Sequence, residues 1–258
     1  MDMAVLLLPR QHTPAAMVDC AAKGVQCVVA ITSGYAESGA EGKAAQDLMV
    51  AEARAAGMRI VGPNCMGLMN THHNLAATTG VVVGLVDKLP KGGIGIVSQS
   101  GALMGTMLAR GVDMEAGFSS TVSVGNQADL NINDFFEYLI EGPKTDVICL
   151  YIEEVREPAR FAALLASARA ADKPVLVLKA GRTAAGAAAV SSHTASLAGP
   201  YAVFEAVCRA HGVLLFESPF DMIQGAMLMG RRPEMSSNAV AERFADDVAP
   251  LITAVANA

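Results

Sequence analysis

Short apolar runs rich in β-branched residues alternate with helix-sized segments along most of the 258-residue chain. Several of these runs are apolar throughout, which is typical of parallel strands that are covered on both faces. They predict strands at residues 4–8, 26–31, 59–61, 94–97, 119–123, 147–152, 175–178 and 213–216. Helices are predicted between the strands at residues 14–23, 42–56, 101–110, 132–140, 158–171, 201–211 and 220–229. This regular order predicts an α/β fold with doubly wound parallel sheets.

The alternation is interrupted once, at residues 70–91, where polar residues lead into a stretch rich in Val and Gly. A second series of strands and helices begins just after it, at Gly93. We therefore expect two domains, at residues 1–75 and 76–230, followed by a linker or tail at residues 231–258. No glycine-rich dinucleotide fingerprint follows the first predicted strand, which counts against a nicotinamide-dependent dehydrogenase.

The composition narrows the class of protein. Hydrophobic residues make up 52% of the chain and charged residues 17%, which is typical of a densely packed globular protein. No apolar run approaches the roughly 20 residues of a membrane-spanning helix, and no leader peptide is recognisable, so we expect a cytoplasmic protein without a membrane partner. The net charge of −6 argues against nucleic acid as a partner. The five cysteines are scattered without a CxxC pair, which predicts free thiols and no metal site.

Two glycine-containing segments follow predicted strands, where open α/β sheets place their ligand sites. The first, residues 62–67, contains Asn64 and Cys65; taken alone, it is better explained as a tight turn. In the second, Ser98 and Ser100 precede Gly101 at the start of a helix. Ser100 is a good N-cap, and a helix start with hydroxyl groups and a bare first turn suits a phosphate group. An ordinary serine-capped helix explains this second segment equally well.

A third segment, residues 191–199, is a polar island in an alanine-rich stretch and contains His193. A lone histidine is more often structural than catalytic, but small neighbours leave this imidazole accessible. A neutral imidazole can accept a phosphoryl group on one ring nitrogen if a carboxylate holds the N–H of the other. Glu153 and Glu154, at the end of a predicted strand, are candidates for that carboxylate, although a solvated strand end would also explain the pair.

In this order, the motifs resemble those of the NDP-forming acyl-CoA synthetases, in particular the ADP-forming acetyl-CoA synthetases. The matching segments are residues 62–67, 98–101, 124–129, 151–153 and 192–199. The chain is also similar, more distantly, to the α-subunit of succinyl-CoA synthetase. The resemblance covers residues 2 to about 229. It implies part of a Rossmann-like CoA-binding domain, followed by flavodoxin-like doubly wound domains of the succinyl-CoA synthetase type.

The resemblance also implies a reaction and a set of roles. An acid, ATP and CoA give acyl-CoA, ADP and phosphate through an acyl phosphate and a phosphohistidine. His193 would carry the phosphoryl group and Glu153 would orient it. Ser98, Ser100 and Gly101 would bind the phosphate, while Asn64 and Cys65 would lie where the CoA-binding domain meets the acyl-phosphate site.

The sequence departs from the family pattern in ways that bear on its partners. We expect the front of the CoA-binding domain and the ATP-grasp domain to be missing from this chain, and Ala195 stands where the resemblance implies Gly. We therefore expect an ATP-grasp β-type subunit or domain to supply the site for ATP, ADP and Mg²⁺, in an oligomer that acts on a small carboxylic acid. The alternatives are a non-catalytic module that senses CoA or acyl-CoA, and a degenerate relative of the synthetases.

Overall fold

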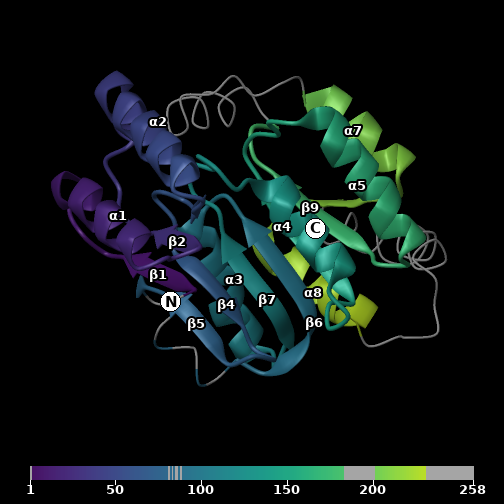
Figure 1. The fold of residues 1–258 in the computed structure, drawn as a ribbon. Helices are drawn as coiled ribbons and strands as arrows, with labels where there is room; N and C mark the ends of the chain where they lie inside the picture. Colours follow the sequence, from purple (N-terminus) through teal and green to yellow (C-terminus); the bar gives the residue numbers. More distant parts are fainter. Residues whose placement is uncertain are drawn as a thin grey trace.

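The computed structural model describes residues 2–80, 82, 84, 87, 89–182 and 201–230. These residues form two β-sheets, of three and seven strands, each covered by helices (Figure 1). Every strand and helix predicted above is present, with bounds that shift by a few residues. The α/β fold class is therefore confirmed.

The smaller sheet consists of three parallel strands in the order β1-β2-β3. The strands are β1 (Met3–Leu6), β2 (Cys27–Ala30) and β3 (Arg59–Val61). The helices that connect them are α1 (Thr13–Ala22) and α2 (Ala40–Ala55), with short 3₁₀ turns η1 (Arg10–His12) and η2 (Ala36–Ser38) before each. Because side chains alternate along β2, Val28 points to the α1–α2 layer and Val29 to the core of the larger sheet.

The larger sheet has the order β10-β9-β8-β6-β7-β4-β5, and the five strands from β10 to β7 are parallel. These five are β6 (Lys91–Ser98), β7 (Phe118–Ser123), β8 (Val147–Ile152), β9 (Val175–Lys179) and β10 (Leu214–Phe216). The strands β7 and β8, which lie on either side of β6, are buried along their whole length, as expected where helices cover both faces.

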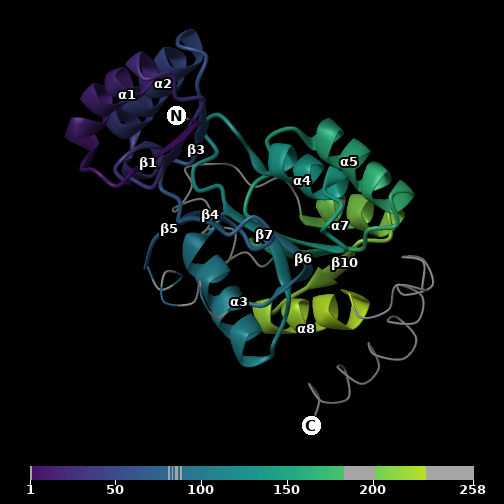
Figure 2. The same ribbon diagram turned by 60° about the horizontal axis from the view of Figure 1, so that its bottom comes forward.

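Among the described residues, five helices cover the two faces of this sheet. On one face lie α4 (Ile132–Glu141), α5 (Pro158–Ala170) and α7 (Tyr201–Ala210); on the other lie α3 (Gly101–Asp113) and α8 (Pro219–Gly230) (Figure 2). The hydrophobic core is divided in the same way. Phe136 and Phe161 pack on the first face, whereas Met104, Met107 and Met222 pack on the second.

An antiparallel hairpin completes the larger sheet and was not predicted. Its strands are β4 (Gly67–Asn70) and β5 (Leu75–Thr78), and β4 pairs antiparallel with β7. The chain therefore changes sheet between β3 and β4. The predicted division into domains after residue 75 stays a prediction.

Asp129 connects the two sheets. Its buried carboxylate, in the loop after β7, accepts hydrogen bonds from Arg54 Nε at 2.8 Å, Arg59 Nε at 2.8 Å and the Ile60 backbone N–H at 2.9 Å. Burial by itself raises the pKa of Asp129, but the hydrogen bonds from Arg59, Ile60 and Arg54 outweigh it and hold the pKa below its ordinary value. The ionised carboxylate therefore stabilises the contact between α2, β3 and this loop.

We expect Asp129→Asn to lower the free energy of unfolding at pH 7 by about 2 kcal/mol, because an amide oxygen replaces only part of these charged hydrogen bonds. A carboxylate with a lowered pKa stabilises the fold above its unfolded pKa of about 4, and this contribution is lost as the pH falls through the folded pKa. Urea unfolding at pH 7, 5 and 3 should therefore show the wild type and Asp129→Asn converging in acid. Asp47→Asn, which removes an exposed ion pair with Lys43, should change stability by less than about 0.5 kcal/mol. Curves that stay parallel down to pH 3 would contradict this assignment.

Within the residues that the structure describes, no helix combines the length and the apolar character needed to cross a membrane.

Candidate functional site

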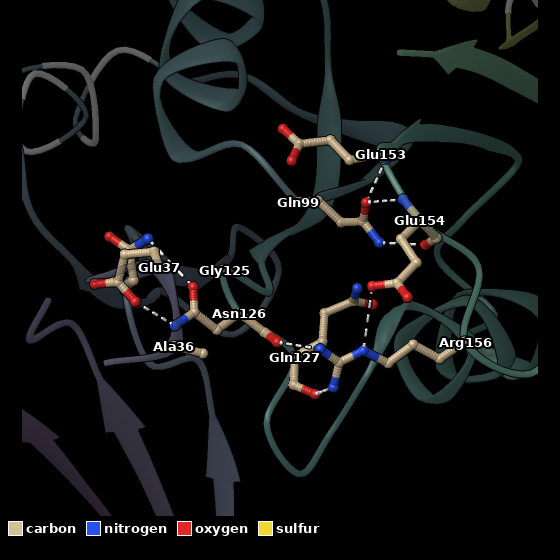
Figure 3. A pocket seen from close by; sticks show the side chains of 10 residues that line it. Ala36, Glu37, Gln99, Gly125, Asn126, Gln127, Glu153, Glu154 and Arg156 are labelled. Atoms are coloured by element: carbon tan, nitrogen blue, oxygen red, sulfur yellow. Dashed lines mark hydrogen bonds and ion pairs between the residues drawn. The ribbon is translucent and has the colours of Figure 1, made fainter. Parts of the chain in front are cut away.

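The carboxyl ends of β6, β7 and β8 face the carboxyl end of β3 around a small cavity of about 40 Å³ (Figure 3). Ligand sites of parallel α/β sheets lie at this edge. The loop after β3 contributes Asn64, and η2 contributes Ala36 and Glu37. The loops after β6, β7 and β8 contribute the other lining residues, which are Gln99, Gly125, Asn126, Gln127, Glu153, Glu154 and Arg156.

Glu153 is the buried carboxylate of this site. It follows β8 directly, and only 6% of its surface is exposed. Figure 3 shows its carboxylate pointing away from Arg156, whereas that of Glu154 points toward Arg156, with 3.6 Å between Glu154 Oε2 and Arg156 Nε. The two neighbouring carboxylates therefore point to opposite sides of the end of β8.

The backbone that carries Glu153 is held on both sides. On the β6 side, the Gln99 side-chain oxygen accepts the backbone N–H groups of Glu153 and Glu154, the latter at 2.8 Å. Gln99 Nε2 donates to the backbone oxygen of Glu154 at 2.6 Å. On the β9 side, Lys179 Nζ donates to the backbone oxygen of Glu153 at 2.8 Å.

Two titratable neighbours respond to Glu153. Burial raises the pKa of the Tyr151 phenol, and the charge of Glu153 and a hydrogen bond to it raise it further. Burial lowers the pKa of Lys179, while the negative charges of Glu153 and Glu154 oppose that change. Tyr151 is thus a neutral hydrogen-bonding neighbour of the carboxylate at physiological pH.

The start of α3 lies beside this strand end, because β6 and β8 are paired neighbours. Ser100 is the N-cap, as predicted, and its hydroxyl oxygen accepts the Leu103 N–H at 3.3 Å. Ser98 is fully buried, and its hydroxyl donates to the backbone oxygen of Ser100 at 2.6 Å. A Cβ at Gly101 would overlap the side chain of Met66, so glycine lets Met66 lie against the first turn. The buried Ser98 hydroxyl thus stabilises the turn by its hydrogen bond to the Ser100 backbone oxygen, and Ser100 caps the helix.

The loop after β3 crosses from the smaller sheet to the larger one. Asn64 has a φ of 55°, in the left-handed region that Asn tolerates, and its Nδ2 donates to Asn126 Oδ1 at 3.3 Å. Cys65 lies buried in the core between the sheets, where its thiol donates to the Ala30 backbone oxygen at 3.4 Å. Burial raises the pKa of Cys65 to about 11, so it is a neutral thiol at physiological pH. The glycines of this segment approach other parts of the chain closely: a Cβ at Gly62 would meet the Ala30 backbone oxygen at 2.5 Å.

Asn126 connects the two sheets at the cavity. Its Nδ2 donates to Glu37 Oε2 and, at 3.0 Å, to Gln46 Oε1. Burial by itself raises the pKa of Glu37, but the hydrogen bonds from Asn126 and from the N–H groups of Gly34 and Tyr35 outweigh it and lower the pKa. Glu37 is therefore ionised at neutral pH.

Arg156 joins the loop after β8 to the loop after β7. Its guanidinium donates to the backbone oxygens of Gln127 and, at 2.9 Å, of Asn126. Among the described residues, no cluster of His, Cys, Asp and Glu has the arrangement of a metal site.

The structure thus brings Glu153, Ser100, Gly101 and Asn64 to one edge of the fold, with Ser98 and Cys65 buried beneath it. His193 lies outside the described residues.

Comparison with known proteins identifies the family. The family described as "Succinyl-CoA ligase like flavodoxin domain" matches residues 91–229, and the family described as "CoA binding domain" matches residues 1–71. The chain is 40% identical over 225 residues to the acetate–CoA ligase [ADP-forming] II subunit alpha of Pyrococcus furiosus, an alignment that covers 87% of this chain. The chain belongs to the ADP-forming acyl-CoA synthetase family.

Other synthetases of this family show the same relationship. The acetate–CoA ligase [ADP-forming] of Methanocaldococcus jannaschii is 38% identical over 242 residues, which are 93% of this chain and 33% of the relative. Among solved structures, the dinucleotide-forming acetyl-coenzyme A synthetase 1 of Ca. Korarchaeum cryptofilum, in complex with phosphate and ADP, is 34% identical with a TM-score of 0.79. That alignment covers 88% of this chain and 48% of the other. The chain spans about half the length of the Pyrococcus relative and of the Korarchaeum enzyme.

Three residues of the site, Gln99, Glu37 and Arg156, were not predicted from the sequence. Gln99 lies inside the segment at residues 98–101, but only the serines on either side of it carry the hydroxyl groups expected of a phosphate site. Glu37 and Arg156 belong to no motif, and only the fold brings them to Asn126. A polar residue directly after a buried strand was the one signal that pointed to Gln99.

Proposed function

We propose that this chain is the α-type portion of an ADP-forming acyl-CoA synthetase that works with an ATP-grasp β-type subunit or domain. The overall reaction converts a small carboxylic acid, ATP and CoA into acyl-CoA, ADP and phosphate. ATP, bound with Mg²⁺ on the partner, phosphorylates His193 and leaves ADP. The phosphohistidine passes its phosphoryl group to the carboxylate of the acid, and the CoA thiol then attacks the acyl phosphate and releases phosphate.

The observation that carries this proposal is the buried carboxylate of Glu153, held on both sides at the end of β8 beside the start of α3. A carboxylate in that position can hold the N–H of one imidazole nitrogen and leave the other nucleophilic. Phosphoryl transfer depends on positioning and charge stabilisation, and a rigidly held acceptor beside a helix N-terminus provides both.

We propose the remaining roles from the geometry of the turn before α3 and from the similarity to the synthetases. Ser98, Ser100 and Gly101 form the phosphate-binding turn, in which Ser98 acts from within the turn and Gly101 offers its N–H. Asn64 and Cys65 belong to the segment that joins the CoA-binding domain, at residues 1–75, to the flavodoxin-like part at residues 76–230. CoA binds on the first domain, and the assembly is a cytoplasmic oligomer.

The test is phosphorylation from ATP. We expect the chain to acquire an acid-labile phosphoryl group when it is mixed with [γ-³²P]ATP, Mg²⁺ and an ATP-grasp β-type subunit. His193→Ala should abolish the label, while His211→Ala, in the turn directly after α7, should keep it. Absence of labelling in the wild type, or undiminished labelling in His193→Ala, would overturn the proposal. Tight CoA binding in calorimetry without labelling would favour a sensing module instead.

A further inference from the structure

We propose that Gln99 is a positioning residue for the phosphoryl-transfer step, acting through Glu153; this inference rests on the proposed function. Gln99 lines the cavity but is not a reacting group, because both ends of its side-chain amide are hydrogen-bonded to the chain itself. Its effect is to fix the backbone from which the Glu153 carboxylate projects.

The Gln99 side chain continues the backbone hydrogen bonding of β8 past the point where β6 ends. The strand β6 ends at Ser98, and the Gln99 backbone N–H still reaches the Tyr151 backbone oxygen at 3.2 Å. Beyond that point β6 turns away into α3, so the backbone of Glu153 and Glu154 has no strand on this side. The Gln99 amide takes the place of a peptide group there: its oxygen accepts two N–H groups, and its nitrogen donates to one carbonyl.

The Gln99 side chain can make all three of these hydrogen bonds because an amide carries an acceptor and a donor on one planar group. A carboxylate would supply only the acceptor, and an apolar side chain would supply neither. Gln99 is almost fully buried, with 6% of its surface exposed, so water does not readily replace the lost partners. An apolar residue would therefore leave two N–H groups and a carbonyl unsatisfied beneath Glu153.

The same residue ties Glu153 to the predicted phosphate-binding turn. Gln99 stands between Ser98 and Ser100, and the Ser100 N–H reaches Ser98 Oγ at 3.2 Å. Its backbone thus belongs to the turn that starts α3, while its side chain holds the end of β8. Gln99 thus couples the position of the helix start to the backbone that carries the Glu153 carboxylate. Displacements of less than an ångström at such a site are enough to slow a transfer step.

Gln99→Met tests the inference, because it keeps the length of the side chain and removes both polar ends. We expect the single-turnover rate of labelling from [γ-³²P]ATP to fall about 10- to 100-fold, the magnitude typical of groups that support a catalytic residue. The ATP concentration that gives half-maximal rate should stay within about threefold of the wild type, since nucleotide binds on the partner. Hydrogen exchange at the Glu153 and Glu154 amides should accelerate in Gln99→Met.

Gln99→Glu restores the acceptor oxygen without the donor, and should recover amide protection together with part of the rate. The control is Thr145→Val, which removes one hydroxyl group and with it the buried hydrogen bond between Ser119 and Thr145, two residues that do not line the cavity. It should cost stability and leave the labelling rate within about twofold. A wild-type rate in Gln99→Met, or an equal loss in Thr145→Val, would overturn the role of Gln99 while the proposed function stands. A wild type that takes no label would overturn the proposed function itself.

Discussion

Glu153→Gln is expected to slow labelling of the chain from ATP by about 10²- to 10⁴-fold while the fold is retained. In the proposed mechanism the Glu153 carboxylate stabilises a positively charged imidazole ring; an amide in its place removes the negative charge and presents an N–H where an acceptor is needed. The change keeps the shape of a side chain that is 6% exposed and next to Tyr151, so packing is preserved. Rapid quenching of the reaction with the ATP-grasp subunit, followed by counting of the acid-labile label, measures the rate.

The neighbouring Glu154→Gln is the matched control. Its carboxylate lies on the opposite side of the strand end, beside Arg156, and is partly exposed (Figure 3). Removing that charge should change the labelling rate by less than about threefold, because a loosely held ion pair at a surface contributes little. Equal losses in the two variants would show that general negative charge, and not the position of Glu153, supports the reaction.

The parallel part of the fold could be predicted from the sequence because most of its strands are short runs of apolar, β-branched residues that alternate with helix-sized segments. The run from Val147 to Ile152 is buried at every position, and such a segment has few alternatives to a covered central strand. The hairpin of β4 and β5 was not predicted because its strands lack such apolar, β-branched runs. Its strands contain Gly, Ala and Asn, which have low strand propensity, and pairing with β7 makes them strands.

The candidate site was predictable where a residue has a local function and not where it depends on distant contacts. Ser100 is recognisable as an N-cap because capping involves residues three positions apart. The amide of Gln99 instead holds residues 54 and 55 positions away, and Asn126 reaches Glu37 across 89. No pattern within a single sequence encodes those pairs. The approach of β3, β6, β7 and β8 at one edge creates them.

The loop after β7 provides the largest expected effect on stability. Gly125 has a φ of 51°, and a Cβ there would overlap the backbone oxygens of Pro63 and Asn64. The two loops therefore lie backbone against backbone at the cavity, and the Asn126 N–H donates to the Pro63 oxygen at 2.9 Å. A side chain at this position must push the loops apart, and with them the contact between the two sheets.

We expect Gly125→Ala to lower the free energy of unfolding by about 3 kcal/mol, of which roughly 1 is backbone strain at positive φ and the rest overpacking. The melting temperature should fall by about 6–12 °C in calorimetry. Gly24→Ala separates the two terms, because Gly24 has a φ of 68° but no atom within 4 Å of the added Cβ. That variant should lose only about 1 kcal/mol. The difference between the variants measures the contact between the loops, and equal losses would mean that Gly125 is required for its backbone angle alone.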